Sequence, residues 1–266
     1  ITPSEKIDDA TVVIRDGKIA AVGKGVPIPR DAQVLEAQGK VITAGLTDAY
    51  TQLGLREIDL ESTTTEGVFA PSPDDEVHAA YRVTDGYNPS SLRIPILRAG
   101  GVTSALSVPR GGLIAGTSAV FSLAGGVDGT RVTAKAPAAM HASLGENVLP
   151  NAKGSRGLAI EQLRELFSDA QQYARNKNAY DKNQSRKLAA SRLDLEALQP
   201  VLRGQVPLWV NVERAADILA LLRLAREFSL RVAVVGGAEA WRVAKELAAA
   251  NVPVILDPAE NLPSSF

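Results

Sequence analysis

The sequence predicts an α/β fold, and the clearest evidence lies in its last third. Strand-like runs occupy residues 208–212, 231–235 and 252–256. Amphipathic helical runs at residues 215–228 and 238–249 separate them. Tightly spaced strand–helix units of this kind form parallel sheets with right-handed crossovers. Continued around, they form a (β/α) barrel of the TIM type, whose functional site lies at the carboxyl ends of the strands.

The first segment of the chain predicts a few short strands outside this barrel. Residues 11–14 and 18–22 flank Asp16-Gly17, a dipeptide that favours a two-residue hairpin turn because glycine accepts a positive φ. Residues 33–37 predict a further short strand. So few strands cannot bury a core by themselves, and we expect them to need partner strands.

Residues 41–54 predict the first strand of the main body. An apolar, β-branched run enters a small-residue turn and then reaches the polar side chains of Tyr50 and Gln52. Because residues i and i+2 of a strand point to the same side, these two side chains should project together. We expect them at the mouth of the sheet or barrel that holds the strand.

The middle of the chain mixes loops and strands. Residues 56–73 predict a long polar loop, which in a compact domain is usually functional or mobile. A short helix is expected within residues 90–100, followed by a strand at residues 102–108. Apolar and small residues alternate between residues 117 and 144, with glycines at the turns, and predict further strands.

Two more helices are expected before the regular last third. Residues 157–176 place apolar side chains on one face, as an amphipathic helix does. The next twelve residues lack such a face and predict an exposed connection. Residues 192–202 return to a helical pattern.

Composition excludes several classes of partner. The 30 acidic and 29 basic residues nearly cancel, and no long run of one sign predicts binding to nucleic acid. No stretch approaches the roughly 18 consecutive apolar residues of a membrane span, so we expect a soluble protein without a membrane partner. The absence of cysteine excludes disulfides and is compatible with either the cytoplasm or the periplasm.

Histidine is equally informative. The chain has only two, His78 and His141, and neither belongs to an HxH or HExxH pair. A metal centre built mainly from imidazoles cannot be assembled from this chain. We therefore predict no metal and no other cofactor.

The chain also resembles a known family. Residues 16–23 (DGKIAAVG), residues 37–40 (AQGK) and residues 41–54 are similar to the opening of the amidohydrolase superfamily, in particular its imidazolonepropionase-like branch. In that branch a hairpin and a strand of this kind lead to a first barrel strand that ends Asp-x-His-x-His. The resemblance continues, in order, through residues 97–120 and 207–263.

This resemblance implies a domain organisation. Residues 1–43 would supply strands of a small β-sandwich, and residues 44–266 would form an amidohydrolase-like barrel that lacks its C-terminal part. A barrel without its closing strand exposes two strand edges, which proteins avoid. We therefore expect a homo-oligomer or association with the remaining C-terminal part of the protein; a stable monomer of this segment alone would contradict that expectation.

The positions of the family's metal ligands hold other residues here. The two histidines of the first strand fall on Tyr50 and Gln52, and the later strand-end histidines fall on Asn211 and Gly236. The final aspartate would lie beyond Phe266. Tyrosine, glutamine and asparagine are weak ligands for zinc, and glycine offers no side chain. For the lysine that some members carbamylate, Lys135 is the nearest candidate, and a solvated lysine is the simpler interpretation.

Two functions follow from these residues and this resemblance. By family, the protein would hydrolyse carbon–nitrogen bonds, other than peptide bonds, in amides or cyclic amides, with a degenerate metal site. The alternative is a non-catalytic relative that binds an unknown small molecule or a partner at the barrel mouth. The ligand-facing candidates are Tyr50, Gln52, Arg110, Asn211 and Glu213, and no catalytic residue can be assigned.

Several other residues could also face the mouth. They are Glu57, His141, Arg214 and Glu239. For Glu213 and Arg214 a simpler interpretation exists, because polar and acidic residues commonly begin the helix that follows a strand. His141 follows an apolar strand and is more typical of a core histidine than of a general base.

Overall fold

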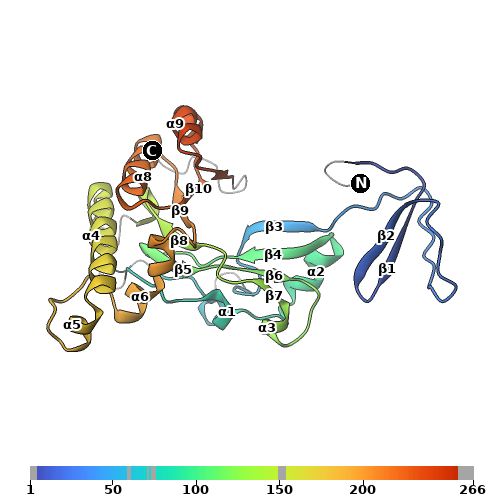
Figure 1. Cartoon of the computed structure of the whole chain (residues 1–266), viewed down its shortest axis with the longest axis horizontal. Coiled ribbons are helices and arrows are strands. Elements are labelled where there is room, and N and C mark those ends of the chain that lie inside the picture. Colours follow the sequence, from blue (N-terminus) through green and yellow to red (C-terminus); the bar gives the residue numbers. More distant parts are fainter. Residues whose placement is uncertain (1–4, 59–60, 71, 73–75, 149–153, 257–266) are drawn as a thin grey trace. The chain divides into compact units, whose positions relative to one another are not determined.

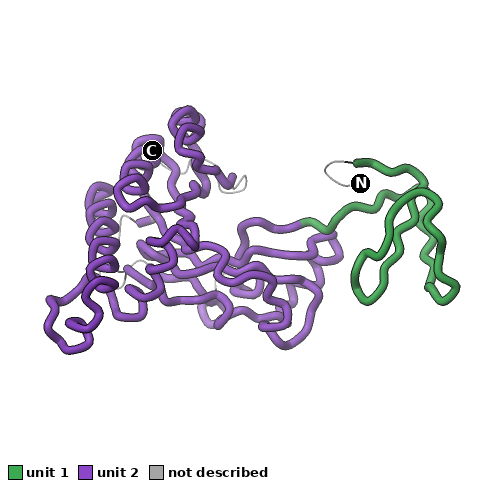
Figure 2. Tube along the Cα trace, viewed as in Figure 1, with its two compact units in different colours: residues 1–46 green, residues 47–266 purple. Residues whose placement is uncertain are grey.

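The computed structural model describes residues 5–58, 61–70, 72, 76–148 and 154–256. The chain forms two compact units, Ile1–Leu46 and Thr47–Phe266 (Figure 2). We describe each unit by itself.

The first unit is built on one hairpin. Strands β1 (Ala10–Arg15) and β2 (Lys18–Lys24) pair antiparallel. Asp16 and Gly17 join them with φ angles of 51° and 71°, which confirms the predicted tight turn. The strand predicted at residues 33–37 is wrong: these residues are irregular. Val34 and Leu35 are 52% and 82% exposed, so this run has no core against which a strand could pack.

A five-stranded sheet organises the second unit. Strands β8, β9, β10 and β11 run parallel to one another, and β5 pairs antiparallel with β8 at the edge. Their bounds are Ile114–Thr117 for β5, Met140–Ser143 for β8, Leu208–Val212 for β9, Val232–Gly236 for β10 and Val254–Ile255 for β11. The predicted parallel strand–helix alternation of the last third is thereby confirmed.

A four-stranded sheet lies in the same unit. Its order is β3-β4-β6-β7, and β6 pairs antiparallel with both β4 and β7. The bounds are Leu46–Thr51 for β3, Val102–Ser107 for β4, Ala119–Ser122 for β6 and Thr133–Lys135 for β7. The α/β class is therefore confirmed, with mixed sheets. Over the described residues of this unit, the strands form two separate sheets, and no closed barrel is seen.

Helices cover the five-stranded sheet. The longest are α4 (Arg156–Arg175) and α8 (Ala215–Phe228), which lie side by side on one face (Figure 1). Both lie within one residue of the predicted bounds, because each has a continuous apolar face. The rings of Phe167 in α4 and Phe228 in α8 are 5.5 Å apart between centroids. This contact anchors the larger of two hydrophobic clusters.

The remaining helices are short. They are α1 (Val83–Gly86), α2 (Arg93–Ala99), α3 (Gly129–Val132), α5 (Lys177–Asp181), α6 (Arg192–Ala197), α7 (Gln199–Leu202) and α9 (Ala244–Ala249), with 3-10 turns η1 (Ser62–Thr64), η2 (Gly145–Val148) and η3 (Ala240–Val243). The helix predicted at residues 238–249 is thus a 3-10 turn followed by α9.

The exposed connection predicted after residue 176 is partly wrong. It contains α5, and Leu188 is only 7% exposed. Asp169 is buried on α4, and its carboxylate accepts a hydrogen bond from Ala189 N at 2.7 Å. This bond holds the end of the connection against α4. A buried carboxylate thus helps to order a segment that has no apolar periodicity.

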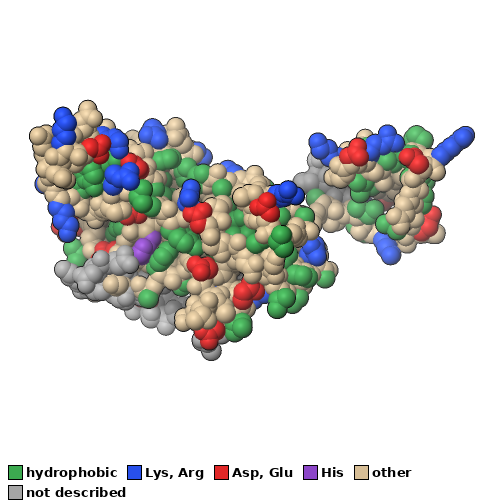
Figure 3. Space-filling model, turned by 90° about the horizontal axis from the view of Figure 1, so that it is seen from below, with side chains coloured by type: hydrophobic (Ala, Val, Ile, Leu, Met, Phe, Trp, Pro, Cys, Tyr) green, Lys and Arg blue, Asp and Glu red, His purple; other side chains and the backbone are tan. Residues whose placement is uncertain are grey.

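The described part of the chain contains no helix long and apolar enough to cross a membrane. On the face of the larger unit seen in Figure 3, Lys and Arg side chains are interspersed with Asp and Glu side chains. This distribution agrees with the near balance of charges in the sequence.

Candidate functional site

The carboxyl ends of β8, β9 and β10 meet at one edge of the five-stranded sheet. In the parallel register, Ser143 lies beside Asn211, and Val212 lies beside Gly236. Asn211 also accepts a backbone hydrogen bond from Leu144 N at 2.9 Å. Two of the positions singled out from the sequence, Asn211 and Gly236, therefore lie at neighbouring strand ends.

Three of the ligand-facing candidates come together at a cavity of about 250 Å³. Tyr50 and Gln52, at the end of β3, line it together with Arg110. The guanidinium carbon of Arg110 lies 5.1 Å from the centre of the Tyr50 ring, a cation–π distance. Arg56 and Arg93 also line this cavity, which is thus rich in hydrogen-bond donors. Asn211 and Glu213 are not among the described residues that line it.

Gln52 supplies a further donor. Its Nε2 atom is buried and has no hydrogen-bond partner. A buried donor without a partner costs about 1–3 kcal/mol. A ligand carbonyl or carboxylate at this position would remove that cost.

The His141 side chain contacts aromatic rings from both sheets of this unit. Its ring centre is 6.0 Å from that of Tyr50 in β3 and 5.7 Å from that of Trp209 in β9. The side chain is only 3% exposed, and Nε2 has no hydrogen-bond partner. Burial, with a smaller contribution from the positive charge of Arg110, lowers the pKa of His141 to about 3. The imidazole is therefore neutral at neutral pH, as expected of a core histidine.

Glu213 has a structural partner on the next loop. Its Oε2 atom accepts a hydrogen bond from Ala238 N at 2.8 Å, and Glu239 Oε2 accepts one from Ala215 N at 2.8 Å. Glu239 N in turn donates to Glu213 O at 2.9 Å. We call this reciprocal pair, Glu213 and Glu239, the carboxylate lock. It fastens the loops after β9 and β10 to each other.

The electrostatics of the lock agree with this geometry. The hydrogen bond from Ala215 N, followed by one from Arg242, holds the pKa of Glu239 below its usual value. Each carboxylate accepts a backbone N–H from the other loop: Glu239 from Ala215, the first residue of α8, and Glu213 from Ala238, which follows β10. Glu213 thus has a structural partner, but this partner lies in the loop after β10 and not in α8, whose N-cap Arg214 makes no side-chain cap hydrogen bond.

Replacing Glu213 by alanine is expected to lower the free energy of unfolding by about 1 kcal/mol, because Ala238 N loses its acceptor. Urea unfolding followed by circular dichroism would measure the change. Glu246→Ala, at an exposed position on α9, is the matched control and should have almost no effect. Equal stability of the Glu213 and Glu246 variants would argue against the lock.

Gly236 explains why the lock can form. Its φ is +80°, and a Cβ atom built on it would lie 2.1 Å from Glu213 Oε1. The Glu213 carboxylate thus occupies the space that a side chain at position 236 would need. In the resembled family a histidine ligand stands at this position.

The residues present do not fit a family-type metal. The four ligand positions hold Tyr50, Gln52, Asn211 and Gly236, and the last of them is filled by the Glu213 carboxylate. Across the described ranges, no three His, Cys, Asp or Glu side chains are grouped so that they could hold a metal ion. Lys135 is exposed on β7, as a solvated lysine would be.

A charged network that the sequence did not reveal lies at the same strand ends. Arg156 Nη2 lies 3.1 Å from Glu146, and Arg156 Nε lies 3.4 Å from Asp217. Burial raises the pKa of Asp217 in spite of the nearby arginines. These residues come from η2, α4 and α8, so no local pattern in the sequence could have brought them together.

Comparison with known proteins places this fold in a class. No family model matches the chain. A solved amidohydrolase from Thermotoga maritima MSB8 is 27% identical with a TM-score of 0.83, and the match covers 96% of this chain and 67% of that one. "Amidohydrolase tasK" from Hapsidospora irregularis is 27% identical over 94% of this chain, which spans only 28% of that protein.

A shorter sequence match is to a dihydroorotase. A dihydroorotase from Anaeromyxobacter dehalogenans strain 2CP-C is 39% identical over 71 residues, which are 26% of this chain and 16% of the dihydroorotase. The α/β fold is thus similar to that of a solved amidohydrolase. These similarities support the amidohydrolase superfamily, which the opening motifs of the sequence also resemble.

Proposed function

We propose that the protein is an amidohydrolase-like hydrolase that acts on carbon–nitrogen bonds, other than peptide bonds, in amides or cyclic amides, and that its metal site is degenerate. The observation that supports the class is the likeness to a solved amidohydrolase along 96% of the chain. The opening motifs favour the imidazolonepropionase-like branch. Because the chain spans 28% of the fungal amidohydrolase, the activity of the whole protein is part of the proposal.

We also propose a two-domain architecture for this chain. Residues 44–266 would belong to a TIM-type (β/α) barrel, and residues 1–43 to a small β-sandwich. In such barrels ligands bind at the carboxyl ends of the strands, where Tyr50 and Gln52 lie.

Binding at this mouth would rely on hydrogen bonds and charge. In amidohydrolases of the metal-dependent kind, a metal-bound water attacks the carbonyl carbon. The residues of this chain do not fit that metal, so we assign Gln52 Nε2 and Arg110 the role of holding a carbonyl or carboxylate oxygen of the ligand. Tyr50 would form the apolar wall. Asn211 does not line this cavity, so we assign it no ligand contact there, and Glu213 would fix the strand ends.

A second candidate function is a non-catalytic relative that binds a small molecule or partner at the mouth. The observation that favours it is the Glu213 carboxylate in the space beside Gly236, where the resembled family places a metal ligand. A site rebuilt in this way can bind without reacting.

Zinc content, and turnover of cyclic amides before and after chelation, distinguish the two candidate functions. We expect the full-length protein to contain much less than one zinc per chain at this site, measured by elemental analysis. Turnover of a member of a cyclic amide panel that survives chelation would support the hydrolase. Ligand binding without turnover across the panel would support the non-catalytic relative. Stoichiometric zinc at this site, lost together with activity on chelation, would contradict the degenerate site.

A further inference from the structure

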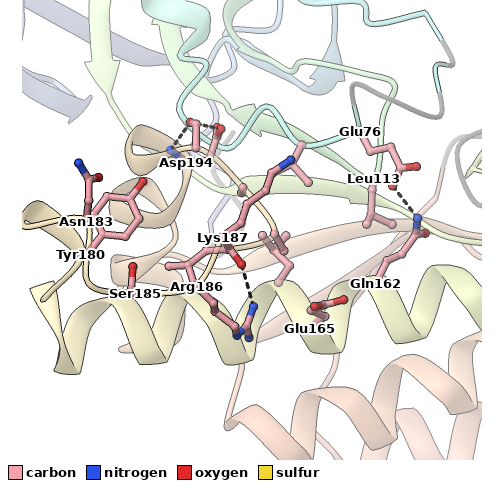
Figure 4. A pocket seen from close by; sticks show the side chains of 16 residues that line it. Glu76, Leu113, Gln162, Glu165, Tyr180, Asn183, Ser185, Arg186, Lys187 and Asp194 are labelled. Carbon is pink, nitrogen blue, oxygen red and sulfur yellow. Dashed lines mark hydrogen bonds between the residues drawn. The ribbon is translucent and has the colours of Figure 1, made fainter.

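A second cavity, of about 940 Å³, shares no lining residue with the one at Tyr50 (Figure 4). Its floor is the face of α4 that carries Gln162 and Glu165, and its cover is formed by residues 183–191. Glu76 and Val77 form the wall, and Val77 extends the sheet by bridging to Ile114 of β5. The volume is within the range of small-molecule sites, about 300–1,000 Å³.

A buried carboxylate on α4 fixes the cover of this cavity. Asp169 is 1% exposed and accepts hydrogen bonds from Ala189 N at 2.7 Å and from the guanidinium of Arg186. A carboxylate this deeply buried is costly unless it is paired. The segment that covers the cavity is therefore held in place by interactions that it cannot give up cheaply.

A second carboxylate fixes the other end. Asp194 of α6 is 9% exposed and accepts hydrogen bonds from Ala80 N at 2.9 Å and from the hydroxyl of Ser191. It joins the segment around Ala80 to the start of α6. The cavity is thus bounded by segments that are tied to each other independently of any ligand.

Gln162 presents an acceptor that lacks a donor. Its Nε2 atom donates to Glu76 Oε2 at 2.8 Å, and its Oε1 atom is buried without a hydrogen-bond partner. A carboxylate can only accept, so the amide must turn its NH₂ toward Glu76, and this fixes the direction of Oε1. An unsatisfied buried acceptor costs about 1–3 kcal/mol, which a bound donor would recover once a small shift of the amide exposes Oε1 to the cavity.

The neighbouring charges indicate which donor fits. Glu165 lies three residues after Gln162 on the same face of α4, and its carboxylate lines the cavity. With Glu76 opposite, three acceptor groups border one end of the cavity (Figure 4). Lys187 extends from the cover and supplies a positive charge. The complementary group is a positively charged donor with several N–H bonds.

We propose that this cavity binds a small molecule that carries a primary ammonium group. The ammonium donates to Gln162 Oε1 and to the carboxylates of Glu76 and Glu165. Charge-assisted hydrogen bonds of this kind are stronger than neutral ones. The ligand is either a diamine or an amino-acid zwitterion, whose carboxylate would pair with Lys187. This site is independent of the function proposed for the barrel mouth.

Isothermal titration of the full-length protein with putrescine and with L-alanine tests the proposal. We expect saturable binding of at least one of them at concentrations up to about 10 mM. Glu165→Gln and Gln162→Leu should each weaken it by about tenfold. Glu165 is exposed, so its substitution leaves the fold intact. Lys187→Met should weaken alanine alone, which separates the two ligand sources.

Two control variants show whether a loss of binding is specific to the residues of this cavity. Glu161→Gln removes a neighbouring exposed charge of α4 that does not line the cavity, and it should leave binding unchanged. Tyr50→Phe alters the other cavity and should also leave binding unchanged. Absence of saturable binding of both probes, or equal weakening by the Glu161 and Glu165 substitutions, would overturn the proposal.

Discussion

Replacing Gly236 by alanine is expected to lower the free energy of unfolding by about 2–3 kcal/mol. Part of the loss, about 1–2 kcal/mol, comes from placing a side chain in the left-handed region, because φ of Gly236 is +80°. The remainder, about 1 kcal/mol, arises because the new Cβ displaces the Glu213 carboxylate and breaks its hydrogen bond to Ala238 N.

Urea unfolding of two matched variants separates these contributions. Gly101 has a φ of +91° and no atom within 4 Å of a built Cβ, so Gly101→Ala carries only the conformational cost. In a Glu213→Ala background, Gly236→Ala should cost no more than Gly101→Ala, because no carboxylate remains to be displaced. If the Gly236 cost were unchanged in that background, Glu213 would not be its cause.

The lock also affects whether a histidine could be accommodated at position 236. A histidine restored at position 236 would meet the same carboxylate. Restoring the ligands at Tyr50, Gln52 and Asn211 would leave Glu213 in place. If the proposed degenerate site is correct, restoring its metal ligands would require changing the lock as well.

Local periodicity made the regular elements predictable. The apolar face of α8 is continuous, and its predicted bounds match the structure. The hairpin at Asp16 and Gly17 was predictable because its turn demands positive φ angles. The strand at residues 33–37 was predicted wrongly, since its composition is strand-like but its apolar side chains find no core.

The candidate site was only partly predictable. Spacing along one strand placed Tyr50 and Gln52 at a common cavity, and Arg110 joins them there. The lock between Glu213 and Glu239 and the pinning of residues 183–191 by Asp169 depend on tertiary contacts between separate segments. No pattern within either segment encodes such a contact, so a single sequence cannot reveal it.

His141 is expected to make the stability of the protein depend on pH below neutrality. Its pKa is about 3 in the folded protein and about 6.5 in the unfolded chain. Between these two values the unfolded state binds more protons than the folded state. The free energy of unfolding therefore falls as the pH falls through this window. Relative to about pH 7.5, the contribution at about pH 5 is a loss of roughly 2 kcal/mol.

Comparison with His141→Phe isolates this contribution. Phenylalanine keeps a ring between Tyr50 and Trp209 but cannot be protonated. Any packing cost of the substitution is the same at both pH values and cancels when each protein is compared with itself. Urea unfolding at about pH 7.5 and about pH 5 should show a loss that is roughly 2 kcal/mol smaller for the variant. Equal losses would mean that His141 is protonated in the folded protein, and that its imidazole is then open to water or to an acidic partner.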